Sequence, residues 1–101
     1  MRSIKLKITK TNIKNGIPVN PGHCPIANSI METVKNAYYV RVLPSEAAIK
    51  VRNGKSVTTY RSKLPEKANN FIRKFDDSQK VKPFAFTLNL NKVNKSLAEL
   101  I

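Results

Sequence analysis

The chain has 101 residues, of which 19 are Lys or Arg and six are Asp or Glu, giving a formal net charge of +13. This length suits one domain with one core, residues 1–101, and 41% hydrophobic residues indicate a globular chain. A single cysteine excludes an internal disulfide. No apolar run reaches the ~18 residues of a membrane span, and the N-terminal segment lacks the apolar core of a signal peptide. We therefore expect a cytoplasmic protein without membrane association. The charge excess favours polyanionic partners, although an AT-rich genome also enriches Lys, Asn and Ile.

The first predicted element is a half-buried strand in the segment "SIKLKIT", residues 3–9. Ile4, Leu6 and Ile8 alternate there with Lys5 and Lys7, which gives the period of two of a strand. The following segment "KNGIPVNPGH" contains two glycines and two prolines and is predicted to be a long loop.

A helix is predicted to begin at Pro25, since proline is tolerated at the first helical position. Ile26, Ile30 and Val34 form its apolar stripe over about three turns. The next segment, "AYYVRVL" at residues 37–43, is predicted to be a strand that Pro44 ends. Its alternation places Tyr38, Val40 and Val42 on one face and Tyr39, Arg41 and Leu43 on the other.

Asn53-Gly54 within "AAIKVRNGKSVTTY" indicates a hairpin. A two-residue turn at that dipeptide would pair apolar with polar positions. Pairing Val51 with Val57 keeps the apolar side chains together, so we expect a longer loop or a bulge.

The second predicted helix begins at Pro65 and carries an apolar stripe of Ala68, Phe71, Ile72 and Phe75. The segment "KPFAFTLNLN" alternates strictly and is predicted to be the last strand, and residues 92–101 are expected to form a short docked helix or a tail. The short link between the second helix and this strand predicts that Phe71, Ile72 and Phe75 pack against Phe84, Phe86 and Leu88.

The resulting order is β-α-β-β-β-α-β, which is typical of the α+β class with an antiparallel or mixed sheet and two helices on one face. A split βαβ arrangement, a variant of the ferredoxin-like fold, is our first expectation.

Basic residues alternate with the core-facing positions of three predicted strands. If these strands are neighbours, their outward side chains share one open sheet face, which is a plausible surface for tracking a nucleic-acid strand. The same pattern also describes the ordinary polar face of a half-buried sheet. The candidate nucleic-acid-binding residues are Lys5, Lys7, Tyr39, Arg41, Lys50 and Arg52. A second basic cluster, off the stripe of the second helix, consists of Lys63, Lys67, Arg73 and Lys74 and fits an ordinary solvated helix face.

Cys24 and His23 are the only cysteine and histidine of the chain, and they directly precede Pro25. A thiol at a helix N-terminus can be activated as a nucleophile, but a buried, inert cysteine is the commoner case and is our expectation. One cysteine and one histidine supply half of a zinc site, and no phosphate-binding glycine motif is present. We therefore expect no catalytic residues, metal or cofactor.

The segments "IKLKIT", "CPIANSI", "LPEKANNFIRKFDD" and "VKPFAFTL" together resemble a class of small uncharacterised proteins of bacteriophage and bacterial genomes. The most specific pieces are "CPIA" and "FIRKFDD" followed by "KPFAF". The resemblance implies a phage-associated origin and a location in the host cytoplasm, and it implies no activity or site residues.

The sequence thus predicts a small basic non-enzymatic protein that binds nucleic acid or a nucleoprotein. The alternative is a protein-interaction module that modulates a host protein, for example as an inhibitor of a host defence or nucleic-acid enzyme. A thiol-dependent enzyme, with Cys24 as the nucleophile, is the third hypothesis. A continuous basic patch would favour the first hypothesis, and a scattered charge excess would favour the second.

Overall fold

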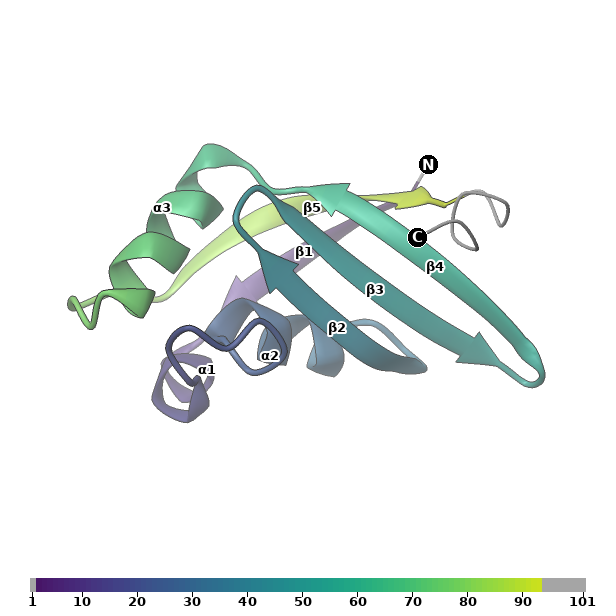
Figure 1. Ribbon diagram of the computed structural model, residues 1–101, viewed down its shortest axis with the longest axis horizontal. Coiled ribbons are helices and arrows are strands. Elements are labelled where there is room, and N and C mark those ends of the chain that lie inside the picture. The colour runs from purple at the N-terminus through teal and green to yellow at the C-terminus, as the bar shows by residue number, and fades with distance from the viewer. Residues whose placement is uncertain (1, 94–101) are drawn as a thin grey trace.

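The computed structural model describes residues 2–93, which form one five-stranded sheet and three helices (Figure 1). In chain order the elements are β1 (Arg2–Ile8), α1 (Lys10–Asn15), α2 (Pro25–Thr33), β2 (Ala37–Leu43), β3 (Glu46–Asn53), β4 (Ser56–Lys63), α3 (Glu66–Asp76) and β5 (Phe84–Lys92). The expected α+β class is confirmed. The predicted tail structure at residues 92–101 falls largely outside the described residues.

The strand order is β1-β5-β4-β3-β2, and every neighbouring pair is antiparallel. The split βαβ order expected from the sequence is not confirmed. β1 and β2 are consecutive strands, yet they occupy opposite edges of the sheet because the chain crosses between them through α1 and α2. This placement decides which basic side chains become neighbours.

The sheet is curled, and its two halves meet only at one end. β1 and β5 pair from Arg2 opposite Leu90 to Ile8 opposite Phe84. β5 and β4 pair only at Tyr60 opposite Lys92 and at the adjacent position. Toward the start of β5 the two strands diverge, and α3 lies across this opening in Figure 1. α2 contacts both β1 and β2, so it fills the concave side of the curl.

The core lies between the concave side of the sheet and the helices. Leu6 and Ile8 of β1 point into it together with Leu88 and Leu90 of β5, as the alternation of both strands predicts. α2 contributes Ile26 and Ile30 of the expected apolar stripe, both fully buried, and Val34 follows as its C-cap. The core residues that are completely or almost completely buried include Leu6, Ile8, Ile26, Ala27, Ile30, Ala47, Ile49, Ala68, Leu88 and Leu90.

Both longer helices start near the predicted prolines. Pro25 is the first residue of α2, as expected. Pro65 is the N-cap of α3, so this helix begins one residue later than predicted, at Glu66. α3 docks on β5 through Phe71 and Phe84, whose ring centroids lie 4.7 Å apart. The predicted packing of the second helix on the last strand is confirmed at this pair.

The short helix α1 was not predicted, because it carries no apolar stripe. A capping box defines it instead: the Thr9 hydroxyl accepts from the Asn12 backbone N–H, and the Asn12 side chain accepts from the Thr9 N–H. Asn12 is buried and donates to Glu32 of α2 at 2.6 Å. A side-chain hydrogen bond to α2, a neighbouring helix that comes later in the sequence, therefore holds α1 in place.

The predicted register of the β3–β4 hairpin is wrong. Val51 pairs with Thr58, not with Val57, and the turn is a two-residue Gly54-Lys55 loop. Gly54 has φ +62°, as the first central residue of a type II′ turn requires. The inward row of β4 is therefore Thr58, Tyr60 and Ser62, and the apolar Val57 points outward.

The predicted inward position of Tyr38 is also wrong. A bulge shifts the β2–β3 register between Ala37 and Tyr39, so that Tyr38 is exposed as well as Tyr39. An extra residue in one strand leaves that residue unpaired and re-aims its side chain. Val40 and Val42 keep their predicted buried positions.

Candidate nucleic-acid interface

The structure brings four of the six predicted binding residues together and separates the other two. Tyr39 and Arg41 on β2 lie beside Lys50 and Arg52 on β3, on the sheet face that points away from the core. Lys5 and Lys7 also point outward, but they lie on β1 at the opposite edge, with β5 and β4 in between. The three strands are not all neighbours, so the expected single patch of six residues does not form.

The group on β2 and β3 is organised as cation–aromatic pairs. Tyr39 pairs directly with Lys50 across the strands, and the Lys50 ammonium lies 5.2 Å from the centre of the Tyr39 ring. The Arg52 guanidinium lies 4.9 Å from the centre of the Tyr38 ring. Such contacts are worth about 0.5–1 kcal/mol at exposed sites, enough to bias the orientation of both rings. We call Tyr38, Tyr39, Arg41, Lys50 and Arg52 the β2–β3 face.

Tyr38 is the member of this group that the sequence reasoning missed. Strict alternation assigns consecutive residues to opposite faces, and nothing in the sequence indicates the bulge that turns Tyr38 outward. The two tyrosines are 44% and 38% exposed, so both rings are accessible at the surface.

Arg61 extends the same face onto β4, where it lies across Ala48 from Arg41. Its guanidinium is 2.6 Å from the Glu46 carboxylate, so part of its charge is already compensated. Within residues 2–93 this is the one ion pair, and Arg41, Lys50 and Arg52 have no acidic partner among those residues.

A shallow hollow of about 270 Å³ adjoins the β2–β3 face at the edge of the sheet. Tyr39, Val40 and Arg41 form one wall, and residues 20–22 form the other. The loop is held there because the Pro21 carbonyl accepts from the Val42 N–H at 2.8 Å. This contact covers part of the β2 edge and leaves a recess beside the tyrosine ring.

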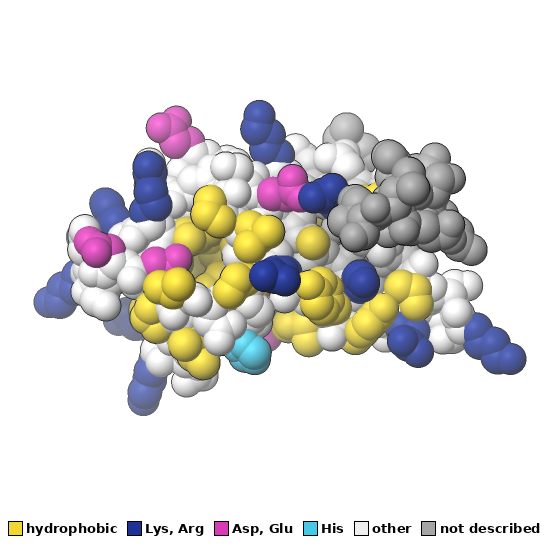
Figure 2. Space-filling model, in the orientation of Figure 1, with side chains coloured by type: hydrophobic (Ala, Val, Ile, Leu, Met, Phe, Trp, Pro, Cys, Tyr) yellow, Lys and Arg dark blue, Asp and Glu magenta, His cyan; other side chains and the backbone are white. Residues whose placement is uncertain are grey.

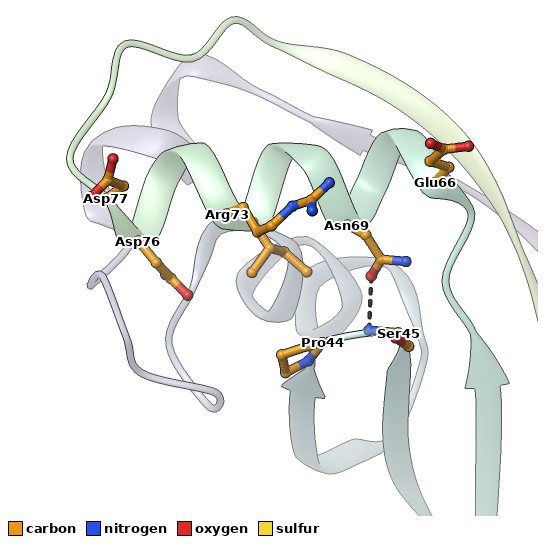
Figure 3. A pocket seen from close by; sticks show the side chains of 8 residues that line it. Pro44, Ser45, Glu66, Asn69, Arg73, Asp76 and Asp77 are labelled. Carbon is orange, nitrogen blue, oxygen red and sulfur yellow. Dashed lines mark hydrogen bonds between the residues drawn. The ribbon is translucent and has the colours of Figure 1, made fainter.

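A larger groove, of about 530 Å³, has the opposite charge character. It lies between α3 and the turn at Pro44 and Ser45 (Figure 3), where the Asn69 side chain accepts from the Ser45 N–H at 2.8 Å. Three of the six acidic residues of the chain line it, partly offset by Arg73. Those acids are Glu66, Asp76 and Asp77. This groove would repel a polyanion.

Cys24 has the environment of a structural cysteine. It is 4% exposed and is the N-cap of α2, where its sulfur accepts from the Ala27 N–H at 3.4 Å. Burial raises the pKa of the Cys24 thiol above its usual value, and the backbone hydrogen bonds of Ala27 and Ile26 oppose this only in part. His23 is exposed and contacts Asn20 through Nδ1 at 3.1 Å. The arrangement therefore favours the protonated, unreactive thiol.

The described part of the chain contains no cluster of three or more His, Cys, Asp or Glu side chains able to hold a metal ion. No helix within residues 2–93 has the length and apolar character needed to cross a membrane. Figure 2 shows one face of the molecule, on which Lys and Arg side chains stand among hydrophobic ones and do not form a single dense field. On the face shown, the charge is thus divided into local groups.

The chain matches no family model, and no curated protein or solved structure matches it at a significant level. The resemblance to phage proteins stays a prediction.

Proposed function

We propose that this protein binds single-stranded nucleic acid, with little sequence preference, through the β2–β3 face. The observation that carries the proposal is the pairing of two exposed tyrosines with two cations, Lys50 and Arg52, on adjacent strands. Proteins that bind single strands combine cations, which contact phosphates, with aromatic rings, which stack on bases. Arg41 lies on the same face and has no acidic partner within the described residues.

Shape supports a single strand over a duplex. The candidate surface is an exposed sheet face, and α2 packs against the core on the other side of the sheet. Base stacking on Tyr38 and Tyr39 needs unpaired bases, because the bases of a duplex are already stacked on one another. The hollow beside Tyr39 offers space at the edge of the sheet for a base or sugar.

The proposal involves no catalysed reaction, and it fits a cytoplasmic, phage-type protein of high positive charge. Its rival is the protein-interaction module, which is favoured by the separation of Lys5 and Lys7 from the β2–β3 face. The two hypotheses differ in one measurable property. Only the nucleic-acid proposal expects the protein to bind a single strand more tightly than a duplex of equal length.

The test measures the anisotropy of a labelled oligonucleotide of about 12 nucleotides, single-stranded or duplex, over a range of salt concentrations. With three phosphate contacts at ~0.7 released counterions each, we expect a slope of log K against log salt near −2. Replacing Arg41, Lys50 and Arg52 together by Gln should abolish most binding and flatten this slope. Replacing Tyr38 and Tyr39 by Ala should weaken single-strand binding by about tenfold or more, at ~1–3 kcal/mol per stacked base, with an unchanged slope.

The matched control replaces Lys5, Lys7 and Lys10 by Gln, which removes the same charge from exposed positions outside the β2–β3 face. We expect a smaller loss of affinity in this variant. Equal losses in the two triple variants would show that only net charge matters, and no binding at low salt by the wild type would remove the proposal in favour of a protein partner.

A further inference from the structure

A second groove, of about 400 Å³, lies on the other flank of α3, between the helix and the segment leading into β5. Residues of α3 at i, i+3, i+4 and i+7 form one wall, since this spacing places them on one helix face. The other wall comes from residues 80–84. The lining residues are Lys67, Asn70, Phe71, Lys74, Lys80, Val81, Lys82 and Phe84. We call this the α3–β5 groove.

The floor of the α3–β5 groove is apolar. The Phe71 and Phe84 rings contact each other at 4.7 Å with a tilt of 37°, and Val81 packs against the core. Phe71 is only 7% exposed, whereas Phe84 and Val81 are half-buried and present part of their surface to the groove. An inserted apolar side chain would therefore meet a preformed apolar surface.

The rim of the groove consists of four lysines. Lys67 and Lys74 are two helical turns apart, about 10 Å along the axis, and Lys80 and Lys82 stand on the facing wall. All four are exposed, and none forms an ion pair within the part of the chain that is described. The groove thus combines an apolar centre with positive charge on both sides.

Local backbone contacts fix the two walls relative to each other. The chain reverses directly after α3 through Ser78, which adopts the left-handed region at φ 58°. The Ser78 N–H donates to the Phe75 carbonyl, and the Gln79 N–H donates to the Lys74 carbonyl at 2.8 Å. The start of the second wall is therefore tied to the end of the helix.

We infer that the α3–β5 groove binds an acidic segment of a partner protein that inserts one aliphatic or aromatic side chain between flanking carboxylates. Charge complementarity indicates an acidic partner, because four exposed lysines surround this groove, whereas the acidic residues of α3 and its C-cap line the groove on the opposite flank of the helix. The apolar floor indicates that the partner inserts an apolar side chain, because side chains buried in such pockets supply most of the binding energy of protein interfaces. This interaction is separate from the nucleic-acid binding proposed for the β2–β3 face.

A nucleic acid fits this groove less well. Phe71 is almost fully buried and its neighbour Phe84 lies against it, so neither ring is free to stack on a base as the exposed tyrosines of the β2–β3 face are.

The test uses a fluorescein-labelled peptide, Glu-Glu-Leu-Phe-Glu-Glu with a Gly-Ser tail, and a second peptide in which Gly and Ser replace Leu and Phe. Binding to the full chain is followed by anisotropy at moderate salt. The groove variant replaces Lys67, Lys74, Lys80 and Lys82 by Gln. The control variant replaces four exposed lysines elsewhere, Lys5, Lys7, Lys10 and Lys14, and so has the same net charge.

We expect the Leu-Phe peptide to bind the wild type, to lose roughly tenfold or more in the groove variant, and to be little affected in the control variant. The Gly-Ser peptide should bind much more weakly than the Leu-Phe peptide. Equal losses in both lysine variants, or equal binding of both peptides, would reduce the interaction to net charge and overturn the inference. A competition experiment with an unlabelled single-stranded oligonucleotide gives a further check. The inference would also be overturned if the groove variant lost more affinity for this oligonucleotide than for the peptide. Circular dichroism of both variants checks that they are folded.

Discussion

Ser62 and Ser29 give the sharpest test of the packing, because the same substitution should have opposite effects at the two sites. Both serines are 1% exposed, Ser29 on α2 and Ser62 on the inner side of β4. The Ser29 hydroxyl donates to the Lys7 carbonyl at 2.8 Å and ties α2 to β1. The Ser62 hydroxyl lies on β4, close to where β5 diverges, and is buried with no hydrogen-bond partner among residues 2–93.

The magnitudes follow from these environments. A buried hydroxyl without a partner costs about 1–3 kcal/mol, so Ser62→Ala should raise the free energy of unfolding by about 1 kcal/mol. Ser29→Ala loses a hydrogen bond worth ~1–1.5 kcal/mol but gains about 0.5 kcal/mol of helix propensity, for a net loss near 0.5–1 kcal/mol. For a domain of this size, 1 kcal/mol corresponds to about 4–8 °C in Tm.

Urea unfolding followed by circular dichroism measures both variants against the wild type. Two substitutions of identical chemistry make a matched pair, since the composition and charge of the two proteins are the same. A Ser62→Ala variant that loses as much stability as Ser29→Ala would refute the reasoning, because it would show that the Ser62 hydroxyl is hydrogen-bonded in the folded protein.

Two further predictions concern α3 and Cys24. Phe71→Ala should lower the free energy of unfolding by about 3–5 kcal/mol of a total of ~5–15, because Phe71 is 7% exposed and packs against the tilted Phe84 ring. A loss below about 1 kcal/mol in urea unfolding would contradict this docking of the helix. Burial raises the pKa of the Cys24 thiol, so its contribution to stability is complete below the ordinary thiol pKa of about 8.5 and is lost as the pH rises above it. Cys24→Ala should remove that part of the alkaline destabilisation, and wild-type Cys24 should react slowly with a thiol reagent at neutral pH; fast reaction, or an unchanged alkaline profile in the variant, would show that the thiol is accessible.

The sequence by itself determines which side of β1, α2, α3 and β5 faces the core. The alternation of Ile4, Leu6 and Ile8 with lysines, and of Phe86 and Leu88 with polar residues, is local and predicts burial correctly. Pro25 likewise marks the start of α2. Its fixed φ angle suits a helix, and the first helical position needs no N–H donor, so this signal is also local.

Strand order, register and bulges depend on contacts between residues far apart in the chain, and only the tertiary structure decides them. Alternation shows that Lys7 and Arg41 both point outward, but β1 and β2 end up at opposite edges of the sheet. Tyr38 joins Tyr39 at the surface only because β2 bulges against β3. Lys67 of α3 and Lys82, fifteen positions later, line one groove because a reversal at Ser78 brings their segments together. Local periodicity contains no information on such pairings, since many neighbours can cover an apolar face equally well.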